Sequence, residues 1–470
     1  MDELWLPFIS IIFLIFFLSK LLSPKQTRRK NLPPSPRALP IIGHLHLLKE
    51  PIHKTLQSLS NQYGPIMFLK FGFRNVVIIS SSALLDDCFN KNDIVLANRP
   101  RLMSGKIMNY NYTTINFSSY NNHWRNFRRI ATCEIFSTSK LMMFMGVREN
   151  EVRIFLKGLF QNSSTSFKKV ELRSRLSELT FNVIMWTISG KRLEESKHIR
   201  DAICEVFEVS GSSNLGDFLP VLQWIDFQGI KKKMVRLHKE IDDFAQGLID
   251  EHRNHKNSCT QGQGRSDTMV NNLLSLQESE PENYSDEIIK SLLLSIIVAA
   301  TDTAAITMEW TMSLLLNHPE MLKKAEAEIA KVVGQDRLLP MKPSDDCTIW
   351  GYDVPRGTML LVNAWAIHMD PKAWDDPTSF KPERFEGYDD KAHKLVPFGL
   401  GRRGCPGAGL ANKVMSLALA SLIQCFEWKR ASEELVDMAE RTRGLTIPKV
   451  QPLEALFKAR ESMLNVLEKI

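Results

Sequence analysis

One short run constrains this chain more than any other segment: residues 397–407, which read PFGLGRRGCPG. Its glycines allow backbone with positive φ and let a flat ligand approach the chain closely. Arginines beside a cysteine stabilise its thiolate and bind carboxylates through paired hydrogen bonds. The run therefore predicts a rigid loop that presents the thiolate of Cys405 to a haem iron and offers arginine to the haem carboxylates.

The alternative reading is a tight surface turn that contains a cysteine by chance. The spacing F-x-x-G-x-R-x-C-x-G, formed by Phe398, Gly401, Arg403, Cys405 and Gly407, argues against it. This pattern resembles the cysteine loop of the cytochrome P-450 family of haem-thiolate monooxygenases. The resemblance implies that Cys405 is the axial iron ligand of haem b and that Arg403 binds a propionate. It also places Phe398, Gly401 and Gly407 among the cofactor-binding residues.

Composition narrows the function classes further. The net charge of +7 is mild and spread along the chain, so it gives no support to nucleic-acid binding. A basic face for an acidic redox partner and an ordinary solvated surface both remain open. The seven cysteines are odd in number and contain no C-x-x-C pair, which fits a reducing compartment rather than a disulfide framework or a zinc site.

The amino terminus predicts a membrane anchor over residues 1–23. Leu4–Leu22 is almost wholly apolar and close to the ~20 residues that span a bilayer. Basic residues follow at 25–30, which places the main body in the cytosol. A cleaved signal peptide is the alternative, but it requires a charged start and a small-residue cleavage site. Residues 24–40 read as a basic and proline-rich hinge, and this order resembles microsomal family members, which implies the endoplasmic reticulum membrane.

The rest of the chain reads as mainly α with a small β portion. Residues 64–72 and 76–80 predict two short strands, residues 83–90 a short helix, and helical patterns dominate from Asn122 to about residue 348. Asn254–Asp267 is polar and predicts a loop. Length alone allows about three domains. The resemblance runs to the last residues and implies instead one haem-thiolate monooxygenase domain, residues 41–470, with the cytochrome P-450 fold.

A second candidate site lies at residues 123–129. Trp124 and Arg128 are four residues apart, so they share one face of a helix and can both donate to a carboxylate. Alone, this short pattern favours an amphipathic helix with a buried tryptophan and solvated arginines. Together with Cys405, the resemblance implies that both side chains hold a haem propionate.

A third candidate site lies within residues 285–317. Ser285 with the two acids after it forms a helix start, and the apolar body predicts a buried helix. A carboxylate at Asp302 and a hydroxyl at Thr303 cost free energy inside a buried helix unless they form hydrogen bonds or serve a function. One alternative has threonine bonding back to the i−4 carbonyl and Asp302 paired with a distant base. The resemblance implies that the two relay protons for dioxygen cleavage, although Ala300 stands where the family usually has glycine.

One expected element is missing. Phe380–Phe385 resembles the family segment in which Arg384 completes a buried ion-pair triad with a Glu and an Arg three apart on an earlier helix. No E-x-x-R occurs between Thr303 and Cys405, and residues 338–346 cannot hold that helix, since three helical turns need about eleven residues. We infer an internal deletion near Leu339-Pro340, so the domain is incomplete around 338–346. Arg384 is then expected to be an unpaired buried charge, at a cost of about 3–5 kcal/mol.

Four stretches narrow the resemblance, at residues 96–102, 111–114, 181–186 and 216–220. They are similar to plant microsomal members, in particular the isoflavone 2′/3′-hydroxylase group. This similarity implies hydroxylation of a flat aromatic substrate, isoflavonoid or phenylpropanoid-like, with dioxygen and electrons from an NADPH-dependent reductase. The alternative is an inactive splice or gene-model variant, a haem-free or misfolded membrane-anchored remnant. A soluble helical binding module is disfavoured by the anchor and by Cys405 in its loop.

Overall fold

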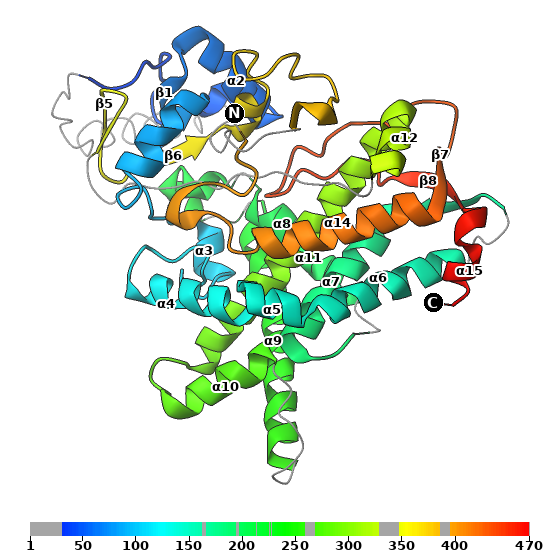
Figure 1. Cartoon of the computed structure of the whole chain (residues 1–470). Helices are drawn as coiled ribbons and strands as arrows, with labels where there is room; N and C mark the ends of the chain where they lie inside the picture. Colours follow the sequence, from blue (N-terminus) through cyan, green and yellow to red (C-terminus); the bar gives the residue numbers. More distant parts are fainter. Residues whose placement is uncertain are drawn as a thin grey trace, which may run out of the picture. The chain divides into compact units, whose positions relative to one another are not determined.

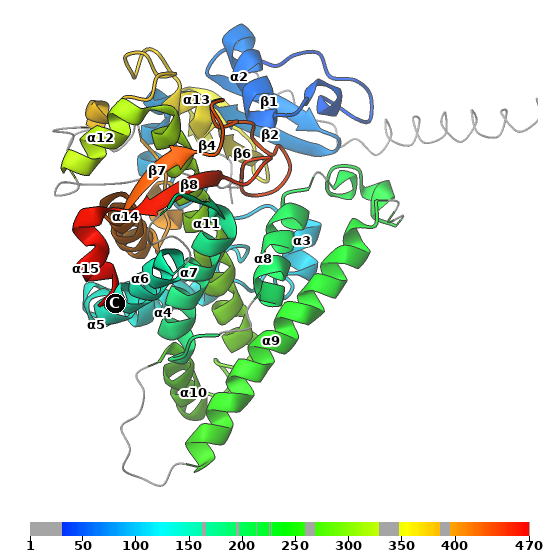
Figure 2. The same cartoon turned by 90° about the vertical axis from the view of Figure 1, so that its right-hand side faces the viewer.

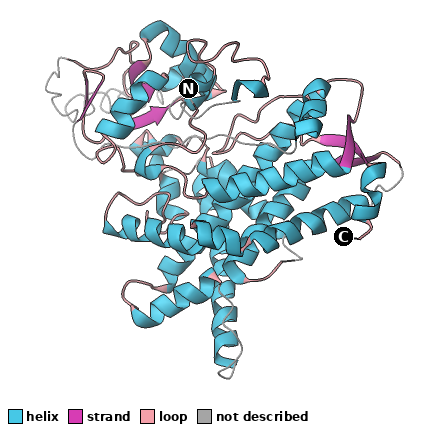
Figure 3. Ribbon diagram, viewed as in Figure 1, coloured by secondary structure: helices cyan, strands magenta, loops and turns pink. Residues whose placement is uncertain are grey.

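The computed structural model describes residues 31–161, 166–193, 197–212, 214–224, 226, 228–258, 268–328, 347–385 and 395–469. The predicted anchor and the deletion point at 338–346 lie outside these residues. The chain divides into two compact units, and Figure 1 labels their helices and strands. The strand-rich unit comprises residues up to Pro100, Asn214–Phe227 and Arg337–Gly404, and the helical unit comprises Arg101–Ser213, Gln228–Asp336 and Cys405–Ile470. Helices make up most of the described chain, and the strands form small groups (Figure 3).

The strand-rich unit is built on a three-stranded sheet of order β1-β2-β6. β1 (Ile66–Phe71) and β2 (Arg74–Ile79) pair antiparallel, which confirms the two predicted strands, and β6 (Met359–Val362) runs parallel to β2. The β2 residues 76–79 are fully buried, since the sheet is covered on both faces there. Gly72 turns the chain between β1 and β2 with a φ of 55°, where a Cβ would lie 2.2 Å from the Phe218 carbonyl oxygen, so only glycine fits.

Other elements of this unit surround the sheet. Residues 347–354 form a two-stranded hairpin, and helical turns replace the single helix predicted at 83–90. Pro34 of the predicted hinge is attached to the sheet, because its carbonyl accepts a hydrogen bond of 2.9 Å from the Phe68 N–H. The described elements include α2 (Ile52–Tyr63), β4 (Cys347–Ile349), β5 (Tyr352–Val354) and α13 (Ala364–His368), with helical turns at Leu45–Leu47, Ser82–Leu84, Asp87–Lys91, Leu215–Asp217, Pro220–Gln223, Pro382–Phe385 and Gly401–Arg403.

The helical unit is organised around α11 (Asp286–Asn317). Ser285 caps it as predicted, with its hydroxyl accepting from the Ile288 N–H at 3.4 Å. The helix packs against α7 (Leu172–Ser189), α8 (Lys197–Ser210), α9 (Ile230–Ser258) and α14 (Ala408–Cys425) (Figure 2). Among the described helices, α11 and α14 are long and apolar enough to cross a membrane, and the bent pair Asn122–Met143 and Met145–Phe160 would add a third. The apolar stretch of α11 is 72% buried inside the protein, so its composition is that of a core helix.

The remaining parts of the helical unit frame this core. A second sheet of order β3-β8-β7 is antiparallel, and Trp428 stacks on Phe457 across it at 5.6 Å between ring centroids. None of its three strands was predicted from the sequence. The described elements include α3 (Met103–Ile107), α4 (Asn122–Ala131), a π-helical turn at Thr132–Phe136, α5 (Thr138–Met143), α6 (Met145–Phe160), β3 (Lys168–Glu171), α10 (Met269–Ser279), α12 (Pro319–Glu328), β7 (Phe426–Arg430), β8 (Glu454–Ala459), a turn at Glu461–Met463 and α15 (Leu464–Leu467).

The start of α11 gives a pH-dependent prediction. Arg253 donates to both Asp286 carboxylate oxygens and Gln277 donates to one, which lowers the Asp286 pKa from its usual 3.8. A lowered folded-state pKa contributes stability above the unfolded value and loses it as the pH falls below about 4. We expect Asp286→Asn to cost about 1 kcal/mol at pH 7, because the pair is about one third exposed. Urea unfolding should show the difference from wild type closing below pH 4, and Glu287→Gln is the control at the same helix end.

Candidate functional site

The first half of the cysteine loop is held within the strand-rich unit by Asp93. Its carboxylate accepts from the Arg402 side-chain Nε at 2.6 Å and from the Arg402 backbone N–H at 3.1 Å. Gly401 has a φ of 64°, and a Cβ there would lie 2.5 Å from the Asp93 carboxylate. The loop therefore requires glycine at 401, as the motif predicts. Sequence reasoning missed Asp93, because no local pattern links it to a loop that lies so much later in the chain.

Arg403 and Phe398 lie in the same part of the loop. Arg403 is 9% exposed, and its Nε donates to the Ala97 carbonyl at 2.6 Å. An arginine has five N–H groups, so this contact uses one of them. Phe398 is half-buried in the turn that follows Val396, whose N–H donates to the His368 ring at 3.0 Å. These contacts fix the path of residues 396–403, which precede Cys405 in the chain.

Cys405 belongs to the helical unit, just before the start of α14. The backbone N–H groups of Gly407 and Ala408 donate to its sulfur, and the guanidinium of Arg128 lies close enough to favour the thiolate. Burial has the larger effect and raises the pKa of the thiol, although part of the side chain is exposed to solvent. A Cβ on Gly407 would lie 3.8 Å from Sγ and 3.4 Å from the Phe136 ring, so glycine keeps the sulfur approachable. Phe136 is a neighbour that the sequence did not indicate.

Trp124 and Arg128 both lie on α4, as predicted. Trp124 is 4% exposed, and its indole N–H donates to the Ile115 carbonyl at 2.9 Å. Because an indole has a single N–H, donation to a propionate would require this bond to be exchanged. Arg128 is half-buried; burial lowers its pKa and the nearby Cys405 raises it. Arg128 thus lies close to Cys405, while the Trp124 indole N–H donates to a backbone carbonyl.

Thr303 lies on the one open face of α11. Ala299, Ala300, Thr303 and Thr307 are partly or fully exposed, whereas most of the helix is buried, and they recur at the spacing of one helical face. The Thr303 hydroxyl donates to the Ala299 carbonyl at 2.8 Å, which is the back-bonding that the sequence left open as an alternative. The methyl of Ala300 belongs to this open face.

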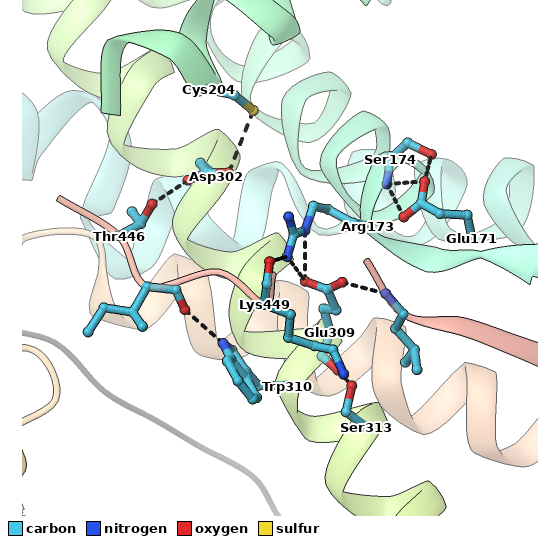
Figure 4. A network of polar contacts seen from close by, with 12 residues as sticks. Glu171, Arg173, Ser174, Cys204, Asp302, Glu309, Trp310, Ser313, Thr446 and Lys449 are labelled. Atoms are coloured by element: carbon cyan, nitrogen blue, oxygen red, sulfur yellow. Dashed lines mark hydrogen bonds and ion pairs between the residues drawn. The ribbon is translucent and has the colours of Figure 1, made fainter. Parts of the chain in front are cut away.

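Asp302 lies on a different face of the helix and is 5% exposed. One carboxylate oxygen accepts from the Thr446 hydroxyl at 3.0 Å, and the other accepts from the Cys204 thiol at 3.7 Å (Figure 4). Burial and the nearby Asp302 charge raise the pKa of Cys204 to about 12, so this thiol stays protonated and can donate. The structure does not bring Asp302 and Thr303 together as a pair.

The expectation for Arg384 was wrong. Its side chain is half-buried and donates to three backbone carbonyls of its own loop: Asp376 and Ser379, each at 2.8 Å, and Lys381 at 3.2 Å. The guanidinium is therefore neither deeply buried nor without partners. The predicted cost of an unpaired buried charge does not arise, because the segment folds back onto its own arginine.

The comparisons with known proteins decide the family. The cytochrome P450 family model matches residues 33–344 and 336–453. The chain belongs to the cytochrome P450 family. It is 49% identical over 500 residues to cytochrome P450 81Q32 of Catharanthus roseus, with 98% of this chain and 97% of the relative covered. It is 44% identical over 498 residues to an isoflavone 2′-hydroxylase of Glycyrrhiza echinata and 45% identical over 489 residues to an isoflavone 3′-hydroxylase of Medicago truncatula. Those alignments cover 98% of each chain for the first relative, and 95% of this chain and 96% of the other for the second.

These findings confirm the predicted family, the similarity to isoflavone hydroxylases and the fold class. They also support the internal deletion. The family model matches in two segments that overlap at residues 336–344. The alignment with the Catharanthus relative has 500 positions against the 470 residues of this chain, so at least 30 positions have no counterpart here.

The contacts of Arg384 lead to a stability prediction. We expect Arg384→Met to speed hydrogen exchange in residues 376–385 and to lower the global free energy of unfolding by less than about 2 kcal/mol, because its acceptors are local carbonyls. Arg403→Met is the matched control, since that arginine is buried and should cost more. A cost of about 3–5 kcal/mol for Arg384→Met would instead indicate a buried charge partner.

Proposed function

We propose that this chain is a haem b-dependent monooxygenase that hydroxylates a flat aromatic metabolite of the isoflavonoid or phenylpropanoid class. The observation that carries the proposal is the environment of Cys405, where two backbone N–H groups and Arg128 surround a sulfur at the start of α14. Such donors suit a thiolate that ligates iron. Family membership and similarity to isoflavone hydroxylases support the cofactor and the substrate class.

The residues present fit a thiolate-bound haem. Cys405 would supply the axial ligand, Gly407 would keep the sulfur accessible, and Arg128 and Arg403 would offer donors to the carboxylates. Trp124 would join them only by giving up its bond to Ile115. Haem with a thiolate ligand activates dioxygen so that one oxygen atom enters a substrate C–H bond.

On α11, Thr303 is the candidate for moving protons. Its hydroxyl lies on the open face and is held by the Ala299 carbonyl, so it can donate after releasing a bond within its own helix. The role of Asp302 as its partner stays a prediction. Electrons would come from an NADPH-dependent reductase. Both proteins would lie at the endoplasmic reticulum membrane, with the catalytic domain in the cytosol, in keeping with the apolar residues 4–22.

A second candidate function is favoured by the missing segment. The resemblance implies an E-x-x-R helix and a strand near the point where the two matched segments overlap, and this chain has no E-x-x-R between Thr303 and Cys405. A chain that lacks a core helix loses burial comparable to typical stabilities of about 5–15 kcal/mol. The chain would then be an inactive splice or gene-model variant that does not take up haem.

The reduced carbon monoxide difference spectrum separates the two. The full chain should be expressed beside a version that carries the missing segment of the Glycyrrhiza relative, and beside Cys405→Ala in each. The monooxygenase proposal expects the red-shifted band of a thiolate-ligated haem from both parent chains and none from Cys405→Ala. A band only from the restored chain would establish the inactive variant. The genomic sequence around codon 339 should then contain an unused exon.

Thr303 allows a separate prediction in whichever parent chain binds haem. We expect Thr303→Ala to keep the haem spectrum but to release peroxide and lower product formed per NADPH by about tenfold or more, since positioned proton donors contribute about 10²–10⁴. Thr311→Ala is the matched control, because its hydroxyl bonds back to Thr307 at 2.8 Å in the same way, two turns further along. Unchanged coupling in Thr303→Ala would refute the role.

A further inference from the structure

We infer that Asp302 is a positioning residue that fastens a carboxyl-terminal loop, residues 441–449, along α11. The use of this loop in catalysis rests on the proposed function, whereas the fastening itself does not. Asp302 and Thr446 are 5% and 4% exposed, and their side chains are joined at 3.0 Å (Figure 4). A buried carboxylate is costly without donors, so this bond and the one from Cys204 explain how Asp302 is tolerated inside the unit.

Independent contacts hold the same loop on both sides of Thr446. The Trp310 indole N–H donates to the Ile447 carbonyl at 2.8 Å, and the Leu445 N–H donates to the Phe207 carbonyl of α8 at 3.0 Å. Arg441 forms an ion pair with Glu208 of α8. The loop thus lies between α8 and α11 and is bonded to each.

The backbone of residues 441–449 has little conformational freedom where it approaches the end of α8. A Cβ built on Gly211 would lie 2.0 Å from the Gly444 carbonyl carbon, so the two backbones approach as closely as glycine allows. Gly444 itself has a φ of 123°, which other residues rarely adopt. With this end of the loop pressed against α8, the Thr446 hydroxyl sets how the following residues meet α11.

The fastening decides which loop side chains face outward. Thr446 points inward, while Leu445 and Ile447 on either side are 47% and 40% exposed. Trp310, which binds the Ile447 backbone, lies seven residues after Thr303 and so on the same open face of α11. Through the Trp310 bond, the backbone of the loop at Ile447 meets the face of α11 that carries the candidate proton donor. A loosened loop would change how an aromatic substrate is oriented rather than how protons are delivered.

This role can be told apart from proton relay by chemistry. A relay needs an ionisable carboxyl group at 302, whereas an anchor needs only an acceptor for the Thr446 hydroxyl. Asp302→Asn keeps an acceptor and removes the acid. Thr446→Val removes the donor and keeps the acid, and Thr446→Ser is its matched control because it retains the hydroxyl.

Hydrogen exchange of the full chain tests the anchor without needing bound haem. Exchange in residues 441–449 should rise by about tenfold or more in Thr446→Val and stay near wild type in Thr446→Ser, since a hydrogen bond to a charged group resists opening by about that much. Asp302→Asn should raise exchange less than Thr446→Val, because its neutral acceptor forms a weaker bond to the Thr446 hydroxyl. Residues 66–79 of the strand-rich unit should be unchanged in every variant. Wild-type exchange in Thr446→Val would overturn the inference.

Turnover by a haem-containing chain tests the consequence for the reaction. Thr446→Val should alter the ratio of hydroxylated products while product per NADPH stays within about twofold of Thr446→Ser. Strong loss of coupling in Asp302→Asn, with Thr446→Val unaffected, would assign Asp302 to proton relay and overturn the positioning role. The expected exchange pattern in a chain that takes up no haem would leave the anchor supported and refute the monooxygenase proposal alone.

Discussion

Two buried carboxylates on α11 determine the path of the carboxyl-terminal segment in the helical unit. Glu309 is fully buried; it accepts from Arg173 of α7 at 2.8 Å and from the Leu453 N–H at 2.8 Å (Figure 4). Asp302 lies two turns earlier and accepts from Thr446. Removing Arg173 would leave the Glu309 carboxylate buried without its cation, at a cost of about 3–5 kcal/mol. Removing the Thr446 hydroxyl would cost Asp302 a hydrogen bond of about 1.5–3 kcal/mol. Because both sets of partners include the segment after residue 440, the apolar core helix and the chain terminus are ordered together.

The cysteine loop is supported by contacts that do not use the missing helix. In the strand-rich unit its described partners are Asp93, the Ala97 carbonyl and the His368 ring, all of which are present in this chain. Arg384 donates to backbone carbonyls within a few residues instead of forming the expected ion-pair triad. Hydrogen bonds of this kind preserve local geometry, but they replace none of the apolar area that a core helix would bury. The loop can therefore keep its shape while the domain as a whole is less stable.

The predictions from sequence were correct for features that neighbouring residues determine. They missed the contacts that residues far apart in the chain make with the site. The cap at Ser285, the strands on either side of Gly72 and the glycine at 401 follow from local rules for caps, turns and positive φ. Asp93, Thr446 and the Ile115 carbonyl act on site residues from far along the chain, and nothing in their own neighbourhoods marks them. The mistaken expectation for Arg384 arose in the same way. We expected Arg384 to be unpaired because the other two members of the family triad are missing. Instead, nearby backbone carbonyls accept its hydrogen bonds.

Ancestry and present activity depend on different parts of this chain. An internal deletion leaves the remaining residues unchanged. The cysteine motif and the 49% identity to a relative are therefore both retained. Activity depends on cooperative packing, in which one absent helix affects every element that it would have covered. The Cys405 environment can thus retain its donors from α14 and Arg128, because the missing segment contributes none of them. For this reason, restoring the segment is a sharper probe of function than changing any residue of the cysteine loop.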